Sequence, residues 1–170
     1  HIINGNETKD IKALLKKGDW DLLYKGLPAV LFHGDLQFDN VLYSDDKKFY
    51  LLDWRQNFSH ADVGDVYYDL SKLYGGILMS YSLLKDSKNF SCNVNGRHVF
   101  YNYNIDYKLN EFLLQYESWI LRNDYDLYKV KLITALIFLN MAPLHEKELR
   151  NLLFFKSKEM LQKLVGDNDR

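Results

Sequence analysis

Three side chains whose oxygen atoms could bind a metal ion or accept a proton lie close together in the sequence: Asp35, Asn40 and Asp53. Asn40 and Asp53 flank residues 41–52, which have the pattern of a β-hairpin, so strand pairing brings the two side chains together. Asp35 lies on the loop that leads into Asn40 and can face the same space. Carboxylate and amide oxygens suit Mg²⁺, and a further Asp can take a proton from an attacking hydroxyl. The set therefore combines a metal site with a general base.

Short apolar runs are expected to position these residues. Residues 29–32 are apolar and predict a buried strand. Residues 41–43 and 49–52 predict two further strands, and the polar, turn-rich residues 44–48 between them predict that the two pair as a hairpin.

The motif HGDLQFDN at residues 33–40, followed by Asp-Trp at 53–54, resembles the catalytic and metal-binding loops of the aminoglycoside phosphotransferase and choline kinase-like family. These enzymes are relatives of protein kinases, whose motifs are H-R-D-x-x-x-x-N and D-F-G. Gly34 in place of Arg, and Trp-Arg at 54–55 in place of Phe-Gly, indicate the small-molecule branch. Residues 63–70, VGDVYYDL, are similar to the family's G-D-x-x-Y-D-L segment.

The resemblance implies a role for each residue of the motif. Asp35 is the expected catalytic base, Asn40 and Asp53 the expected Mg²⁺ ligands, and ATP or GTP the co-substrate. Asp69 is expected to support the site by accepting backbone N–H groups of the catalytic loop. We interpret His33 as a buried hydrogen-bonding brace of that loop.

One position departs from the kinase pattern. Protein kinases commonly carry a Lys two residues after the catalytic Asp, where this chain has Gln37. Gln cannot neutralise the charge of a phosphoryl group. Arg55 could supply a cation and contact phosphate instead, because a guanidinium binds phosphate oxygens in a bidentate way. A solvent-exposed Arg without that role is the open alternative.

The expected fold class is α+β and mainly α-helical: the C-terminal lobe of a protein-kinase-like fold. We expect one unit over residues 1–170, with lead-in helices at 1–28, the catalytic and metal loops at 29–54, and a helical subdomain at 55–170 with a β-hairpin insertion at about 89–104. Neither a glycine-rich loop nor a Val-Ala-Ile-Lys strand precedes the motif. A nucleotide-binding N-terminal lobe is therefore expected as a partner of this chain.

Helical spacing of apolar residues predicts the elements of that subdomain. Helices are expected at residues 8–17 with Thr8 as N-cap, 19–24, 65–81 with Asp65 as N-cap, 107–121, 126–141 and 145–164. Asp69 falls on or beside the buried face of the third of these. Alternating residues around Asn95-Gly96 predict the hairpin, with strands at 90–94 and 98–103. His98, Tyr101 and Tyr103 could line a substrate pocket, or simply decorate a surface hairpin.

Composition indicates a single packed core: 47% of the 170 residues are hydrophobic, 26% are charged, and the net charge is −1. We therefore expect no nucleic-acid partner. The single Cys92 cannot form an internal disulfide. We find no signal peptide and no apolar run of membrane-spanning length, and expect a cytoplasmic protein without a membrane partner.

The function that we expect is transfer of the ATP γ-phosphoryl group to a hydroxyl of a small acceptor. Candidate acceptors are choline-like amino alcohols, aminoglycosides and sugars, and the substrate-binding residues are unknown; Asp39, Asp62, Tyr67 and Trp119 offer weak material for a cation pocket. A catalytically inactive, pseudokinase-like binding or scaffolding domain is the alternative. A protein kinase is disfavoured by Gly34 and Trp54 and by the lack of an Ala-Pro-Glu segment.

Overall fold

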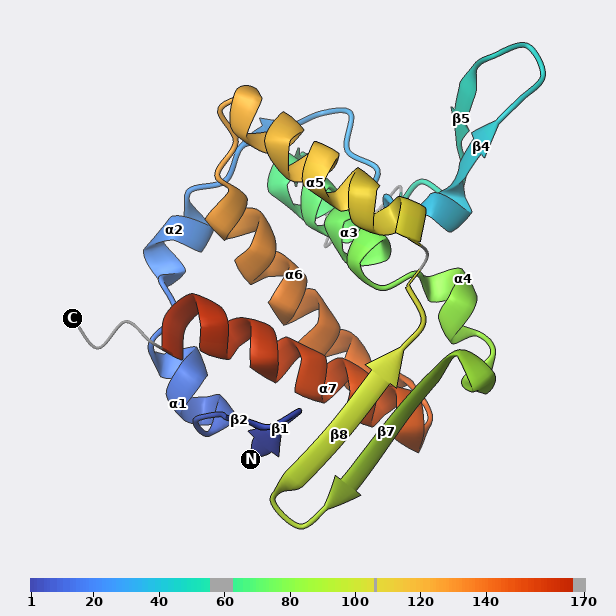
Figure 1. The fold of residues 1–170 in the computed structure, drawn as a ribbon. Coiled ribbons are helices and arrows are strands. Elements are labelled where there is room, and N and C mark those ends of the chain that lie inside the picture. Colours follow the sequence, from blue (N-terminus) through green and yellow to red (C-terminus); the bar gives the residue numbers. More distant parts are fainter. Residues whose placement is uncertain (56–62, 106, 167–170) are drawn as a thin grey trace.

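The computed structural model describes residues 1–55, 63–105 and 107–166. Its centre is helix α6 (Leu127–Met141), which lies between α3 (Val66–Leu78) and α7 (Lys147–Leu161) (Figure 1). Helix α5 (Tyr107–Arg122) packs against α3. Small sheets lie at the edges of these helices, so the chain is mixed α+β with a mainly helical body.

The expected lead-in helices are present, somewhat shorter, as α1 (Ile11–Lys16) and α2 (Trp20–Tyr24). Two short strands that were not expected, β1 (Ile2–Ile3) and β2 (Asn6–Glu7), precede them. Ile3 is fully buried, which favours strand pairing over an isolated helix start. The predicted N-cap Thr8 is also wrong: the Asp10 carboxylate accepts the Lys12 N–H, because Asp10 is the residue with extended backbone directly before the helix.

The hairpin predicted at about residues 89–104 pairs with this N-terminal segment. β7 (Phe90–Asn95) pairs antiparallel with β8 (His98–Tyr103), and β1 pairs parallel with β8, giving the strand order β2-β1-β8-β7. The structure thus contains the predicted hairpin, with Gly96 at φ +57° in its turn. Tyr101 is buried in the cluster that this sheet forms with α7. The hairpin is therefore one half of a sheet that packs on the helical body.

The first hairpin is formed by β4 (Val41–Tyr43) and β5 (Phe49–Leu51), as predicted, and follows a 3₁₀ turn, η1 (Phe38–Asn40). It projects away from the helices (Figure 1), so its side chains are largely exposed.

The expected strand at 29–32 is wrong. Of these residues only Ala29 lies in a strand, β3 (Pro28–Ala29), which pairs with β6 (Gly64–Asp65). Val30 and Leu31 are 82% and 85% exposed. A short apolar run does not by itself specify a strand, and the partner strand β6 has only two residues in the described part of the chain.

Helix α3 begins after Asp65, whose side chain accepts the Tyr67 N–H, as expected for its N-cap. It ends at Leu78, before the expected Tyr81. The remaining short elements are α4 (Tyr81–Leu84), η2 (Ser87–Asn89), η3 (Ala142–Leu144) and η4 (Gln162–Gly166).

The central helix corrects one further expectation. Leu127–Leu144 is long and apolar enough to cross a membrane by length and composition, with a mean hydropathy of 1.4 over 18 residues. This segment contradicts the expectation that the chain has no apolar run of membrane-spanning length. Core helices of soluble proteins meet the same criterion, so this composition alone is weak evidence for a membrane span.

Candidate active site

The backbone of two loops forms the frame of the site. The Arg55 N–H donates to the His33 carbonyl at 2.9 Å and joins the loop at 33–40 to the one at 53–55. Gly34 has φ +77°, and a Cβ there would lie 2.9 Å from the Cβ of Arg55. Glycine is therefore the residue that fits this position. Asp53 also has positive φ, +55°, at the tip that follows β5.

Asp69 holds the first loop from helix α3. Its two carboxylate oxygens accept the backbone N–H groups of His33 at 2.7 Å and Gly34 at 2.9 Å. Burial raises the pKa of Asp69 above its ordinary value, although these two bonds act in the opposite direction. The contact is the one that the family resemblance implies.

His33 is 2% exposed and lies against the Trp54 ring, with 5.1 Å between the ring centroids. The Asp35 N–H donates to its Nδ1 at 3.2 Å, so Nδ1 is an acceptor there. Nε2 is buried without a hydrogen-bond partner in the described part of the chain. These contacts fit a brace of the loop.

Asn40 and Asp53 meet where the first hairpin starts and ends. The Leu52 N–H donates to the Asn40 carbonyl at 2.8 Å, which places the following residue, Asp53, beside Asn40. The Asn40 amide nitrogen donates to the Asp35 carbonyl at 2.9 Å, leaving its side-chain oxygen for another partner. Both side chains line the same cavity.

This donor set fits Mg²⁺. The described residues contain no cluster of three or more His, Cys, Asp or Glu side chains that could enclose a metal alone. Mg²⁺ typically takes one or two protein carboxylates and completes its shell with water and phosphate oxygens. Asn40 and Asp53 would hold it in this way.

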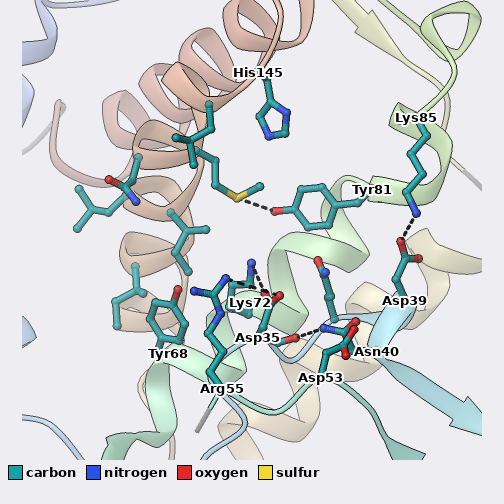
Figure 2. A pocket seen from close by; sticks show the side chains of 17 residues that line it. Asp35, Asp39, Asn40, Asp53, Arg55, Tyr68, Lys72, Tyr81, Lys85 and His145 are labelled. Carbon is teal, nitrogen blue, oxygen red and sulfur yellow. Dashed lines mark hydrogen bonds and ion pairs between the residues drawn. The ribbon is translucent and has the colours of Figure 1, made fainter. Parts of the chain in front are cut away.

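Asp35 lies in a cavity of about 920 Å³ between the two loops and α6 (Figure 2). Its Oδ1 is buried and lies 2.7 Å from the Lys72 ammonium of α3. Its Oδ2 faces the Arg55 guanidinium at 4.0 Å. The proposed base is thus flanked by two cations.

The far wall of the cavity is largely apolar and comes from α6, with Ile133, Leu136, Ile137 and Met141. Tyr81 crosses the space, and its hydroxyl donates to the Met141 sulfur at 3.5 Å. Burial, and then the nearby Asp35 charge, raise the pKa of Tyr81 well above its ordinary value. At one rim Lys85 pairs with Asp39 at 2.9 Å (Figure 2).

Sequence reasoning missed Lys72 and the wall from α6. One signal for Lys72 was present: it lies three residues after Asp69, so the two share one side of the helix. The α6 residues gave no signal, because an apolar helix without a polar stripe does not show which side faces a cavity.

Other predicted residues lie elsewhere. Tyr67 packs against Lys129 and Trp119 stacks on Tyr116, and neither lines the cavity. Asp62 lies outside the described residues. His98, Tyr101 and Tyr103 lie on β8 and do not line the cavity formed by the described residues. Of the described residues expected in a cation pocket, only Asp39 therefore lines the cavity.

Comparison with known proteins finds a match between part of the chain and one family model. Residues 6–85 match the family model of the phosphotransferase enzyme family. The matched part includes every loop residue of the site and also Asp69 and Lys72, and it supports the resemblance to aminoglycoside phosphotransferases. A search of curated proteins and a search of solved structures found no match. The phosphotransferase match therefore indicates the general class of reaction, and the site must indicate the rest.

Proposed function

We propose that this chain is the acceptor- and metal-binding lobe of a small-molecule kinase, which transfers the γ-phosphoryl group of ATP or GTP to a hydroxyl. One observation carries the proposal. Asp35, Asn40 and Asp53 line a single cavity, within the segment that matches the phosphotransferase family. A general base beside hard oxygen ligands is the arrangement that phosphoryl transfer needs.

Asp35 orients the acceptor hydroxyl and takes its proton. As the O–H bond breaks, the acceptor oxygen bonds to the γ-phosphorus, and the bond from that phosphorus to the β–γ bridging oxygen breaks, leaving the electron pair on the nucleoside diphosphate. Mg²⁺ held by Asn40 and Asp53 would neutralise phosphate charge. Arg55, 58% exposed at the cavity edge, can swing toward a phosphate oxygen.

The nucleotide would lie between this chain and an N-terminal lobe that packs on the first hairpin. The exposed apolar residues around that hairpin support this part of the proposal. They are Leu42, Tyr43, Phe49, Tyr50, Leu51, Leu52 and Trp54, which are 38–71% exposed. A surface of this kind marks a contact with another protein part.

The acceptor would enter between Asp35 and α6. The cavity has room for an amino alcohol or a sugar ring, and its lining mixes an apolar wall with tyrosine and charged side chains. Choline-like amino alcohols, aminoglycosides and sugars are the acceptor classes to test.

The test is Mg²⁺-dependent nucleotide consumption by the full-length protein against a panel of those acceptors. Asp35→Asn should abolish acceptor-dependent turnover, while Asp45→Asn, a matched change on the hairpin turn, should leave it intact. Failure of the wild-type protein both to turn over any acceptor and to bind Mg²⁺–nucleotide would refute the proposal and favour a scaffolding domain.

A further inference from the structure

Lys72 is a buried lysine inside the candidate active site. Its side chain is 8% exposed, and it reaches the cavity from α3 (Figure 2). Burying an ammonium is costly unless a close partner compensates it. That partner is Asp35, with 2.7 Å between Nζ and Oδ1.

The two oxygens of Asp35 have different surroundings. Oδ1 is inaccessible to solvent and is occupied by Lys72. Oδ2 lies 4.0 Å from Arg55, whose side chain is 58% exposed and so free to move aside. Only Oδ2 is therefore placed to meet an acceptor hydroxyl.

We infer that Lys72 is a positioning residue for the proposed base: it holds Oδ1 and thereby presents Oδ2 to the acceptor. The inference rests on the proposed function. Lys72 also sets a positive charge beside Asp35, where Gln37 of the same loop is neutral. That charge reduces the repulsion between the Asp35 carboxylate and the nucleotide phosphates.

Other cations around the cavity are placed differently. In the described part of the chain, Lys72 is the cation nearest to Asp35, and the Lys85 ammonium is engaged by Asp39 at the rim. The centre of the Tyr81 ring lies 5.7 Å from the Lys72 ammonium, a further favourable contact for this buried charge. The ammonium thus lies at Oδ1, whereas the Arg55 guanidinium faces Oδ2.

The experiment compares Lys72→Met and Lys72→Gln in the full-length protein, with kcat and the nucleotide KM measured separately. A buried lysine outside the site, Lys129, provides the matched control: it is 1% exposed and donates to the Lys25 carbonyl at 2.6 Å. Lys129→Met should lower the melting temperature and leave kcat unchanged.

Both Lys72 variants should lose about 100-fold in kcat, with the nucleotide KM within about threefold of wild type. Lys72→Arg should recover part of the loss. A wild-type kcat in either folded variant, or a rise in the nucleotide KM with kcat unchanged, would overturn the inference. A wild-type protein without acceptor-dependent turnover would instead refute the proposed function, and the inference with it.

Discussion

The amide nitrogen of Asn40 donates to the backbone carbonyl of Asp35 at 2.9 Å. The expected metal ligand therefore also holds the loop that carries the expected base. Because one amide serves both tasks through different atoms, the metal position and the base position are coupled.

Substitution of Asn40 should separate these tasks. Asn40→Ala removes the metal oxygen and the N–H donor together, so we expect about a 100-fold loss of kcat and about a tenfold rise in the Mg²⁺ concentration for half-maximal activity. Asn40→Asp keeps an oxygen ligand but loses the N–H donor. Compared with Asn40→Ala, it should bring the half-maximal Mg²⁺ concentration closer to the wild-type value than it brings kcat.

Metal titration of activity checks this. Asn89→Ala is the control, since the Asn89 amide makes the same kind of bond, to the Leu83 carbonyl at 2.9 Å, outside the site. If Asn40→Ala keeps the wild-type Mg²⁺ dependence, Asn40 is not a metal ligand.

Asp69 should matter for stability and rate alike. Asp69→Ala leaves the backbone N–H groups of His33 and Gly34 without their acceptor, so we expect a loss of about 2–4 kcal/mol in the free energy of unfolding. The freed loop should also lower kcat. Urea denaturation followed beside turnover tests both effects, and a variant of unchanged stability would show that these bonds do not hold the loop.

Gly34→Ala should destabilise the chain more than Gly96→Ala. Both glycines have positive φ, a conformation that costs an L residue about 1–2 kcal/mol. At Gly34 the new Cβ would also meet Arg55, whereas a Cβ at Gly96 meets no atom within 4 Å. Thermal unfolding should therefore show the larger fall in melting temperature for Gly34→Ala, together with lost activity. Equal falls in melting temperature would mean that the loops at 33–40 and 53–55 can move apart at little cost in free energy.

Glu159 should make the chain acid-sensitive. Burial acts to raise its pKa, but a hydrogen bond from Tyr101 and the charges of Lys156 and Lys163 outweigh burial and lower the pKa below its ordinary value of 4.5. The folded chain thus binds this proton more weakly than the unfolded chain. The carboxylate stabilises the fold above pH 4.5, and this contribution is lost as the pH falls through the lowered pKa.

The free energy of unfolding of wild type and Glu159→Gln, measured from about pH 6 to pH 3, tests this directly. The wild-type advantage should shrink as the pH falls. An advantage that stays constant with pH would show that the charge on Glu159 is not what stabilises the fold.

Local patterns in the sequence predict much of this structure. The turn residues at 44–48 and Asn95-Gly96 predict both hairpins, and Asp65 predicts the start of α3, since each is a contact between near neighbours in the chain. The spacing of Asp35, Asn40 and Asp53 likewise predicts one shared cavity, because a single hairpin brings them together.

Contacts between distant segments could not be predicted in this way. The parallel pairing of β1 with β8 joins residues nearly a hundred positions apart, and no local pattern specifies it. Val30 and Leu31 have the composition of a buried strand, but no strand of the described residues pairs with them, and both are exposed. Lys72 has the appearance of a surface lysine until the loop that carries Asp35 folds against α3.

The most direct test of the central claim is to identify the products formed from nucleotide and acceptor by the full-length protein and by Asp35→Asn. We predict nucleoside diphosphate and phosphorylated acceptor in equal amounts from the wild type, and neither product from Asp35→Asn. Nucleoside diphosphate without phosphorylated acceptor, or equal yields from both proteins, would contradict the assignment of Asp35 as the base of a small-molecule kinase.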